Sequence, residues 1–573
     1  MKNRIFECAF CLVAFAVLLW FLLLNFGAER MPDEIPQVSQ WRNFFSRGMF
    51  AVCAVAMLLF VRRKVAIEVF LWSICAAATA EAVLGLMQLY GFRFSNHGIF
   101  RLTGTFYNPG PLGGYIAMAV PAVLYLFIKT SQIYRRKSLL VKPVKYLIVI
   151  RYCVLLAMIS VMLVVLPSTM SRTGWIAAVV SSGYVIYNLF PVKSWIERHT
   201  SRIKIAVVAV VCVSALVGAW KLKSESALGR LLIWKVSALA VADSPVVGHS
   251  NFAAAYGNAQ EEYFVNHSHN SAEAAVAGAP DYAFNEYLHF AVVWGVPLML
   301  LVWAVVALVA IVGYRRGRYG FCGTVVAFMV FAFASYPAHL PAFVAVLLIA
   351  VTGCLWQRVN KLRVRMLFVG AAVVVAVAMF FGYSFYNDRC ESMRRWEKSR
   401  WLYNSKLYAK AAESYEAIEY EMKWNPRFLY EYGHSQYKSG KKLDAIYTLK
   451  DCLKISGDAM VLNVLGECYQ SYISFMSHAE QCFIRSTRRL PNRMYPHYLL
   501  YRLYCKDYYY YPYKRMQVYH TIVTMPVKIH SPAIDDMLNE VKATEPTLGH
   551  QDEVYYHYLH YIPGMEFYSW PMP

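Results

Sequence analysis

Charged residues are scarce in this sequence. They make up 16% of its 573 residues, whereas 58% are hydrophobic, and the mean hydropathy is +0.36. A soluble protein of this length would not have so apolar a composition, so the sequence predicts a polytopic membrane protein. The formal net charge of +22 at pH 7 would also suit a nucleic-acid-binding protein. The positions of the basic residues decide between these two classes.

The motifs of several enzyme classes are missing. No segment fits the phosphate-binding loop GxxxxGK[ST], the metalloprotease motif HExxH or the hydrolase motif GxSxG. These absences argue against an ATP-driven transporter, a metalloprotease and an α/β-hydrolase. The segment HSHNSAE contains His267, His269 and Glu273, but their spacing is not that of a recognised zinc site. We therefore expect no metal and no cofactor.

About eleven apolar runs are long enough to cross a bilayer, since roughly 20 helical residues span its hydrocarbon core. They lie near 5–26, 44–61, 65–91, 111–128, 146–166, 174–190, 203–220, 287–312, 320–335, 340–356 and 366–384. The first run follows Lys2 and Arg4, as in a signal peptide, but the many spans behind it favour an uncleaved anchor. The expected fold class is an all-α bundle of membrane helices.

Lys and Arg collect in every second connecting loop. These basic loops lie near 62–64, 129–145, 193–204, 315–318 and 358–365. A cytoplasmic N-terminus places all of them inside, in agreement with the positive-inside rule. The loops 27–43, 92–110, 167–173, 221–286 and 336–339, and everything after the last span, then face outward. We expect a multi-pass protein of a bacterial inner membrane, with these parts in the periplasm and no nucleic-acid partner.

Residues 385–573 differ in character from residues 1–384, which we expect to form the membrane domain. They are charged and rich in Tyr, with helical periodicity, and small residues recur at a spacing of about 34 residues. The recurring positions are Gly433, Gly466, Ala412, Ala445 and Ala479. This pattern resembles the tetratricopeptide repeat, a helical hairpin, in about three copies from Trp401 to Leu500. Such repeats bind peptides or proteins, so we expect a protein partner here, or a helical cap on the membrane domain.

Three arginines lie in outward loops beside spans, where the positive-inside rule makes them less expected. Arg101 is in RLTGTFYNPGPLGGY, Arg172 in SRTGW and Arg230 in GRLLIWK. One such arginine would be explained by snorkelling to lipid headgroups or by pairing with an acid. Three of them favour a shared anion site, because the planar guanidinium clamps phosphate with two hydrogen bonds and keeps its charge.

The segments RLTGTFYNPGPLGGY, SRTGW, GRLLIWKVSALAVADSPVVGHSNF and FNEYLHFAVVWGVP resemble, in this order, the motifs of the O-antigen ligase and polymerase superfamily. The resemblance covers about residues 70–350. It implies a membrane glycosyltransferase that moves a glycan from a polyprenyl diphosphate to an acceptor hydroxyl outside the cytoplasm, without a metal. The family's diphosphate arginines map onto Arg172 and Arg230, with Arg101 as a third candidate. Fixed cations there stabilise the charge that grows on the leaving diphosphate.

The sequence departs from this family at a histidine that is proposed to activate the acceptor hydroxyl. In the family it directly precedes Asn, Ser or Gln, but the aligned pair here is Phe284 and Asn285, with Gly295 at the matching distance. Glu286 and His289 are the first candidates to replace it. They lie on one helical face, where a carboxylate raises the basicity of an imidazole.

Other acids and histidines are weaker candidates. Asp281, His267 and His269 belong to the long outward loop. A buried, hydrogen-bonded histidine explains His289 equally well, and a dissociative transition state needs no base. Glu81 lies near the middle of the third predicted span, and an acid in a membrane is a functional candidate that would neutralise an arginine or face a substrate cavity.

The acceptor is left open by the sequence. A lipid A core implies a ligase, a second glycan repeat a polymerase, and a Ser or Thr of a protein an oligosaccharyltransferase. The alternative from another class is a membrane scaffold without activity, whose repeats recruit envelope proteins. Retention of Arg172 and Arg230 argues against the scaffold.

Overall fold

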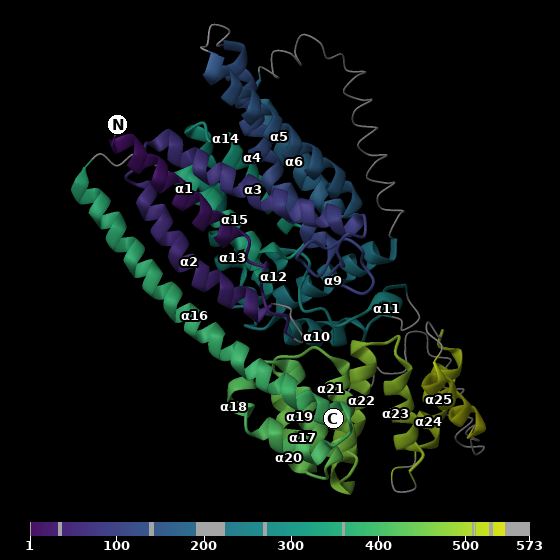
Figure 1. The fold of residues 1–573 in the computed structure, drawn as a ribbon. Helices are drawn as coiled ribbons and strands as arrows, with labels where there is room; N and C mark the ends of the chain where they lie inside the picture. Colours follow the sequence, from purple (N-terminus) through teal and green to yellow (C-terminus); the bar gives the residue numbers. More distant parts are fainter. Residues whose placement is uncertain are drawn as a thin grey trace, which may run out of the picture. The chain divides into compact units, whose positions relative to one another are not determined.

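The computed structural model describes residues 2–31, 37–136, 142–190, 224–267, 272–357, 361–506, 509, 511–526 and 531–544. Every regular element in these ranges is a helix (Figure 1). The predicted all-α fold class is confirmed. The chain folds into two compact units. The first unit comprises residues 1–222, 284–287 and 299–391, and the second comprises residues 223–283, 288–298 and 392–573.

Five helices in the described residues are long and apolar enough to cross a membrane. They are α3 (Arg63–Leu89), α4 (Pro109–Arg136), α5 (Lys142–Ser168), α13 (Val296–Arg315) and α16 (Leu362–Asn404). Shorter apolar helices are α1 (Lys2–Leu22), α14 (Tyr319–Ala332) and α15 (Pro341–Leu355). The helices α2 (Val38–Leu58) and α6 (Arg172–Leu189) lie at two further predicted spans. The number of spans stays a prediction, and the predicted run 203–220 lies outside the described residues.

The predicted run 287–312 is not one helix. The helix α12 (Glu286–Trp294) ends at Gly295, and α13 begins at Val296. Gly295 has φ +82°, which no α-helix contains, and a Cβ on it would lie 2.0 Å from the carbonyl oxygen of Val246. The prediction of one continuous helix over this run is therefore wrong, because hydropathy carries no information on backbone conformation.

The helix α4 lies at the centre of the first unit and packs against α3, α5, α6 and α14. Close contacts depend on small residues, since a Cβ on Gly114 would lie 2.3 Å from the ring of Phe331 in α14. A Cβ on Gly174 of α6 would lie 2.9 Å from the backbone of Gly113. Small residues at such positions let membrane helices approach closely, where van der Waals packing holds them together.

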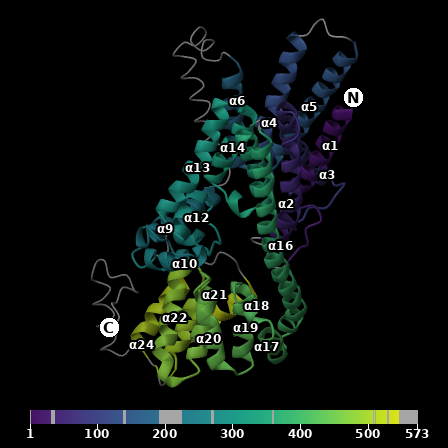
Figure 2. The ribbon, with the colours of Figure 1, turned by 90° about the vertical axis from the view of Figure 1, so that its left-hand side faces the viewer.

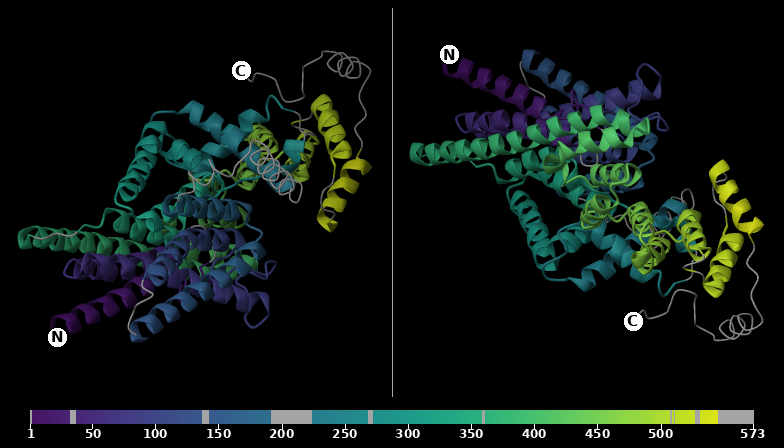
Figure 3. Two further views of the ribbon diagram at one scale, coloured as in Figure 1. Left: turned by 90° about the horizontal axis from the view of Figure 1, so that it is seen from above. Right: turned by 90° about the horizontal axis from the view of Figure 1, so that it is seen from below.

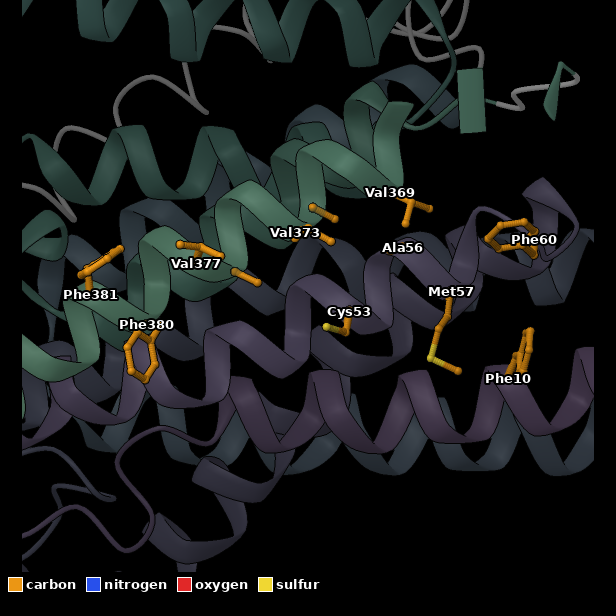
Figure 4. Close-up of a pocket in the computed structure, with 12 residues that line it drawn as sticks. Phe10, Cys53, Ala56, Met57, Phe60, Val369, Val373, Val377, Phe380 and Phe381 are labelled. Atoms are coloured by element: carbon orange, nitrogen blue, oxygen red, sulfur yellow. The ribbon is translucent and has the colours of Figure 1, made fainter. Parts of the chain in front are cut away.

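The helix α16 is one continuous helix of 43 residues (Figure 2), so it runs through residue 384, where we expected the membrane domain to end. Gly382 and Phe45 bring it close to α2, and both views of Figure 3 draw it alongside α1 and α2. An apolar groove of about 610 Å³ lies between these helices (Figure 4). Phe10, Phe60 and Phe381 are among its lining residues, and such a surface suits lipid acyl chains.

The second unit joins two separate parts of the sequence. The long loop contributes α9 (Ser224–Asp243), α10 (Phe252–Tyr263) and α11 (Ala272–Val276). The C-terminal part contributes α17 (Tyr408–Glu416), α18 (Glu419–Met422), α19 (Pro426–Lys438), α20 (Lys442–Leu453), α21 (Ala459–Tyr469), α22 (Met476–Arg489), α23 (Met494–Tyr504), α24 (Pro512–Thr524) and α25 (Pro532–Ala543). Consecutive helices from α19 to α24 pack against each other as hairpins.

The recurring glycines of the C-terminal part lie inside these hairpins. A Cβ on Gly433 of α19 would lie 2.8 Å from Leu449 of α20, and one on Gly466 of α21 would lie 2.4 Å from Phe483 of α22. Each glycine thus makes room for a large side chain of the next helix. Their spacing reflects equivalent packing positions in successive hairpins, while the assignment to the tetratricopeptide family stays a prediction.

Candidate active site

The turn that follows Arg101 is held by two buried polar residues of α3. Glu81 is 3% exposed and accepts hydrogen bonds from the backbone N–H (3.0 Å) and the hydroxyl of Thr105. The side-chain oxygen of Gln88 accepts from the N–H groups of Thr103 (3.0 Å) and Gly104 (2.7 Å). Glu81 therefore fixes the RLTGT turn. Arg101 itself is exposed.

Arg172 is the first residue of α6, after a well-defined helix cap. The hydroxyl of Ser171 accepts from the N–H of Gly174 and donates to the carbonyl of Gly110, both at 3.3 Å. The second contact joins the SRTGW motif to the start of α4, in the RLTGTFYNPGPLGGY motif. Arg172 is half-buried at a helix N-terminus, where its charge adds to the positive end of the helix dipole.

Arg230 is half-buried on α9 in the second unit. Its helix is fixed by the indole N–H of Trp234, which donates to the carbonyl of Ala283 at 3.1 Å. Lys235 of α9 forms an ion pair with Glu273 of α11, and the hydroxyl of Tyr263 donates to the same carboxylate. The hydrogen bond from Lys235, followed by that from Tyr263, lowers the pKa of Glu273.

Two of the motifs that resemble the ligase family are joined by backbone hydrogen bonds in the second unit. The backbone N–H of His249 donates to the carbonyl of Val292 at 2.8 Å, and the backbone N–H of Ser250 donates to the carbonyl of Val293 at 3.0 Å. A Cβ on Gly248, which has φ +75°, would lie 2.6 Å from the backbone of Val293. Gly248 and Gly295 are thus required by close backbone contact between the VVGHSNF and FAVVWG segments.

Glu286 lies at the start of α12 and is fully buried. Its Oε1 accepts from the N–H of Ala338 at 2.6 Å and lies 3.3 Å from Nδ1 of His339. Its Oε2 has no hydrogen-bond partner among the described residues. The side chain of His339 is 23% exposed, so a buried carboxylate stands behind an imidazole that reaches the surface. Neighbouring Asn285 is also buried.

His339 is a candidate site residue that was not predicted from the sequence. It lies in the predicted outward loop 336–339, but more than fifty positions from Glu286 along the chain. No local pattern links the two residues. The only available signal was a histidine in a short loop on the same predicted side of the membrane as the motifs.

The other predicted acids and histidines have different surroundings. His289 is 8% exposed, and its ring stacks on that of Phe252, with centroids 4.8 Å apart. His267 is exposed and stacks on Tyr263 at 3.9 Å. Asp281 is exposed at the surface. Desolvation by nearby protein atoms, followed by the negative charge of Asp458, raises its pKa. His269 lies outside the described residues.

Metal binding has no support in the described part of the chain. No group of three or more His, Cys, Asp or Glu side chains is placed to hold an ion there. Glu273, one of the residues in HSHNSAE, is engaged by Lys235 and Tyr263 instead.

Comparison with known families identifies the central part of the chain. Residues 155–303 match the model of a family described as O-antigen ligase. This segment is similar to the O-antigen ligase family. The matched segment contains Arg172, Arg230, Glu286 and His289, whereas Arg101 and His339 lie outside it. The family indicates a membrane glycosyltransferase of the ligase or polymerase type, and the predicted resemblance is confirmed. No curated protein matches the chain.

Proposed function

We propose that this O-antigen ligase domain protein transfers a glycan from a polyprenyl diphosphate to an acceptor hydroxyl on the outer face of a bacterial inner membrane. The observation that carries the proposal is the family match, which includes Arg172 and Arg230 in the motifs SRTGW and GRLLIWK. Each arginine is half-buried on a helix. Both have the charge and the forked donor geometry that a diphosphate requires.

The arginines act on the leaving group in this proposal. The acceptor oxygen forms a bond with C1 of the sugar, the bond from C1 to the diphosphate oxygen breaks, and its electron pair stays on the diphosphate. Arg172 and Arg230, with Arg101 as a third contact, stabilise this growing negative charge. Preorganised cations at such a position lower the barrier because they interact more strongly with the transition state than with the substrate.

The proton of the acceptor hydroxyl passes to His339 in the same proposal. With a proton on Nδ1, the imidazole donates to Oε1 of Glu286 and presents an unprotonated Nε2. A buried carboxylate that orients a half-buried imidazole is a common general-base arrangement. Glu286 thus keeps the role predicted from the sequence, but with His339 as its partner in place of His289.

The test is a glycan profile of cells that lack the chain. They are complemented with wild type, Arg172→Ala, Arg230→Ala or the matched control Arg93→Ala, since Arg93 is exposed in the loop 92–110. Lipopolysaccharide, exported polymer and glycoproteins are stained separately. We expect one of these products to disappear and to return with wild type and the control only. The product that disappears then identifies the acceptor. Restoration by both arginine variants would contradict the proposal.

A further inference from the structure

A buried arginine at the end of α22 binds two side chains of α10, a helix of the long loop. The side chain of Arg489 is 2% exposed. Its Nη2 donates to Oδ1 of Asn258 at 2.7 Å, and its Nε donates to Oε2 of Glu261 at 3.4 Å. Arg485, one helical turn earlier, donates to Oε1 of Glu261 at 2.8 Å. One carboxylate of the loop therefore binds two arginines of the C-terminal part.

The backbones of the two parts also touch. A Cβ on Gly257 of α10 would lie 2.7 Å from Cα of Gly457, and a Cβ on Gly457 would lie 2.4 Å from the carbonyl oxygen of Ala253. The side-chain amide of Gln260 donates to the carbonyl of Arg489 and to that of Gly278. The two glycines permit an approach that any other residue would prevent.

The chemistry of this contact makes it specific. Burial lowers the pKa of Arg489, and the charge of Glu261 opposes that effect. A buried guanidinium without its partners is strongly destabilising, because it loses hydration and gains no compensating charge. Glu261 and Asn258 supply this compensation, and both lie on the same helix as Gly257.

The helix α10 is in turn connected to the helix that carries Arg230. It packs against α9, and α9 packs against α11. Glu273 of α11 joins the three helices, because it binds Lys235 of α9 and Tyr263 of α10. A continuous set of contacts therefore leads from Arg489 through α10 to α9.

We propose that Arg489 clamps the long loop of the O-antigen ligase domain and thereby positions Arg230. The C-terminal hairpins are then a structural part of the donor site, whether or not they also bind a partner protein. Arg489 is a positioning residue, since it acts through α10 and contacts no substrate. The role of Arg230 in this statement rests on the proposed function, whereas the clamp itself does not.

Hydrogen exchange of the full chain in lipid nanodiscs tests the clamp directly. In Arg489→Gln and in Gly257→Ala we expect amides of α10 to exchange at least about tenfold faster, while α19 and α20 stay protected. Gly257→Ala is informative because alanine favours a helix, so that harm here comes from the contacts of the added methyl group with Gly457 and Arg489 of the C-terminal part. Unchanged exchange of α10 in both variants would overturn the clamp.

Matched controls exclude a general effect of substitution. Arg493→Gln removes an exposed arginine just beyond α22, and Gly278→Ala adds a methyl group where nothing lies within 4 Å. Neither should alter the exchange of α10. Faster exchange of α10 in these controls would show that the effect is not specific to the clamp and would contradict the proposal.

Binding of undecaprenyl diphosphate to the same nanodiscs tests the positioning of Arg230. We expect Arg489→Gln to weaken binding about tenfold, Arg230→Ala to weaken it at least as much, and Arg493→Gln to leave it unchanged. Weaker binding in Arg230→Ala but normal binding in Arg489→Gln would overturn the positioning role. Normal binding in Arg230→Ala would contradict the proposed function instead, and the exchange result would still decide the clamp.

Discussion

The two units of this protein are stabilised by different means. In the first unit, only 17%, 11% and 0% of the residues in the most apolar stretches of α5, α13 and α16 are buried within the protein. These helices therefore depend on lipid to cover their apolar side chains. Its interior contacts depend on small residues such as Gly114. The second unit has short helices that bury carboxylates among several donors, as Glu431 and Glu480 do. Substitutions should therefore act through packing in the first unit and through polar networks in the second.

The largest effect on stability is expected at Glu431. It accepts hydrogen bonds from Trp396 (3.1 Å), Tyr415 (3.1 Å) and Arg400 (3.2 Å) while only 3% exposed. Glu431→Gln should cost about 3 kcal/mol, because Arg400 loses its buried counter-charge. Thermal unfolding of the full chain in nanodiscs measures this loss, with Glu413→Gln at an exposed position as the control. Equal stability of the two variants would contradict the assigned network.

The next effect concerns activity in the first unit. Glu286→Gln and His339→Gln should each slow glycan transfer about a hundredfold without unfolding the protein, which is the usual contribution of a general base. His289→Gln should have a smaller effect, since His289 packs on Phe252. Transfer rates and thermal unfolding are measured together. Loss of transfer in His289→Gln alone would assign the role of general base to His289 instead of His339.

A packing test in the first unit should give a moderate effect. Gly114→Ala forces a methyl group to within 2.3 Å of the Phe331 ring and should destabilise the bundle by about 2 kcal/mol. Gly183→Ala in α6 is the control, because nothing lies within 4 Å of its Cβ. The two variants are compared by thermal unfolding in nanodiscs. Equal unfolding temperatures would show that α4 and α14 do not pack as described.

The smallest expected effect is a pH dependence of stability that arises in the second unit. Burial, with Lys438 nearby, lowers the pKa of His434 to about 4, and the hydroxyl of Tyr403 lies 2.8 Å from its Nδ1. Since the unfolded chain binds this proton more readily, stability should fall as the pH drops from about 6.5 to 4. After discounting for partial exposure, the loss is about 1 kcal/mol. His434→Gln should reduce this slope in thermal unfolding at pH 7 and 5, and an unchanged slope would exclude His434 as its source.

The fold class and the family were predictable because they depend on local patterns. Long apolar runs indicate membrane helices, and ordered motifs around Arg172 and Arg230 indicate the family. The break at Gly295 was not predictable, because hydropathy does not distinguish a continuous helix from two helices joined by a left-handed residue. Its cause is the backbone contact with Val246, which is distant in sequence.

The same limit applies to the site. Glu286 was found from its place in a motif, but its contact with His339 depends on how α12 and the 336–339 loop fold together. The contact between Arg489 and Glu261 was even less predictable, since the two residues lie more than two hundred positions apart. Contacts over such distances leave no periodicity or spacing in a single sequence.

The most direct test of the account is the release of polyprenyl diphosphate by the purified full chain in nanodiscs. The donor is a glycosylated undecaprenyl diphosphate, and the acceptor is the one that the glycan profile identifies. We predict release by wild type and by Arg93→Ala, and a loss of about a hundredfold or more in Arg172→Ala and Arg230→Ala, because both arginines stabilise the leaving group. Equal release by wild type and both arginine variants would contradict the account, and no release by wild type above that of empty nanodiscs would favour a scaffold without transferase activity.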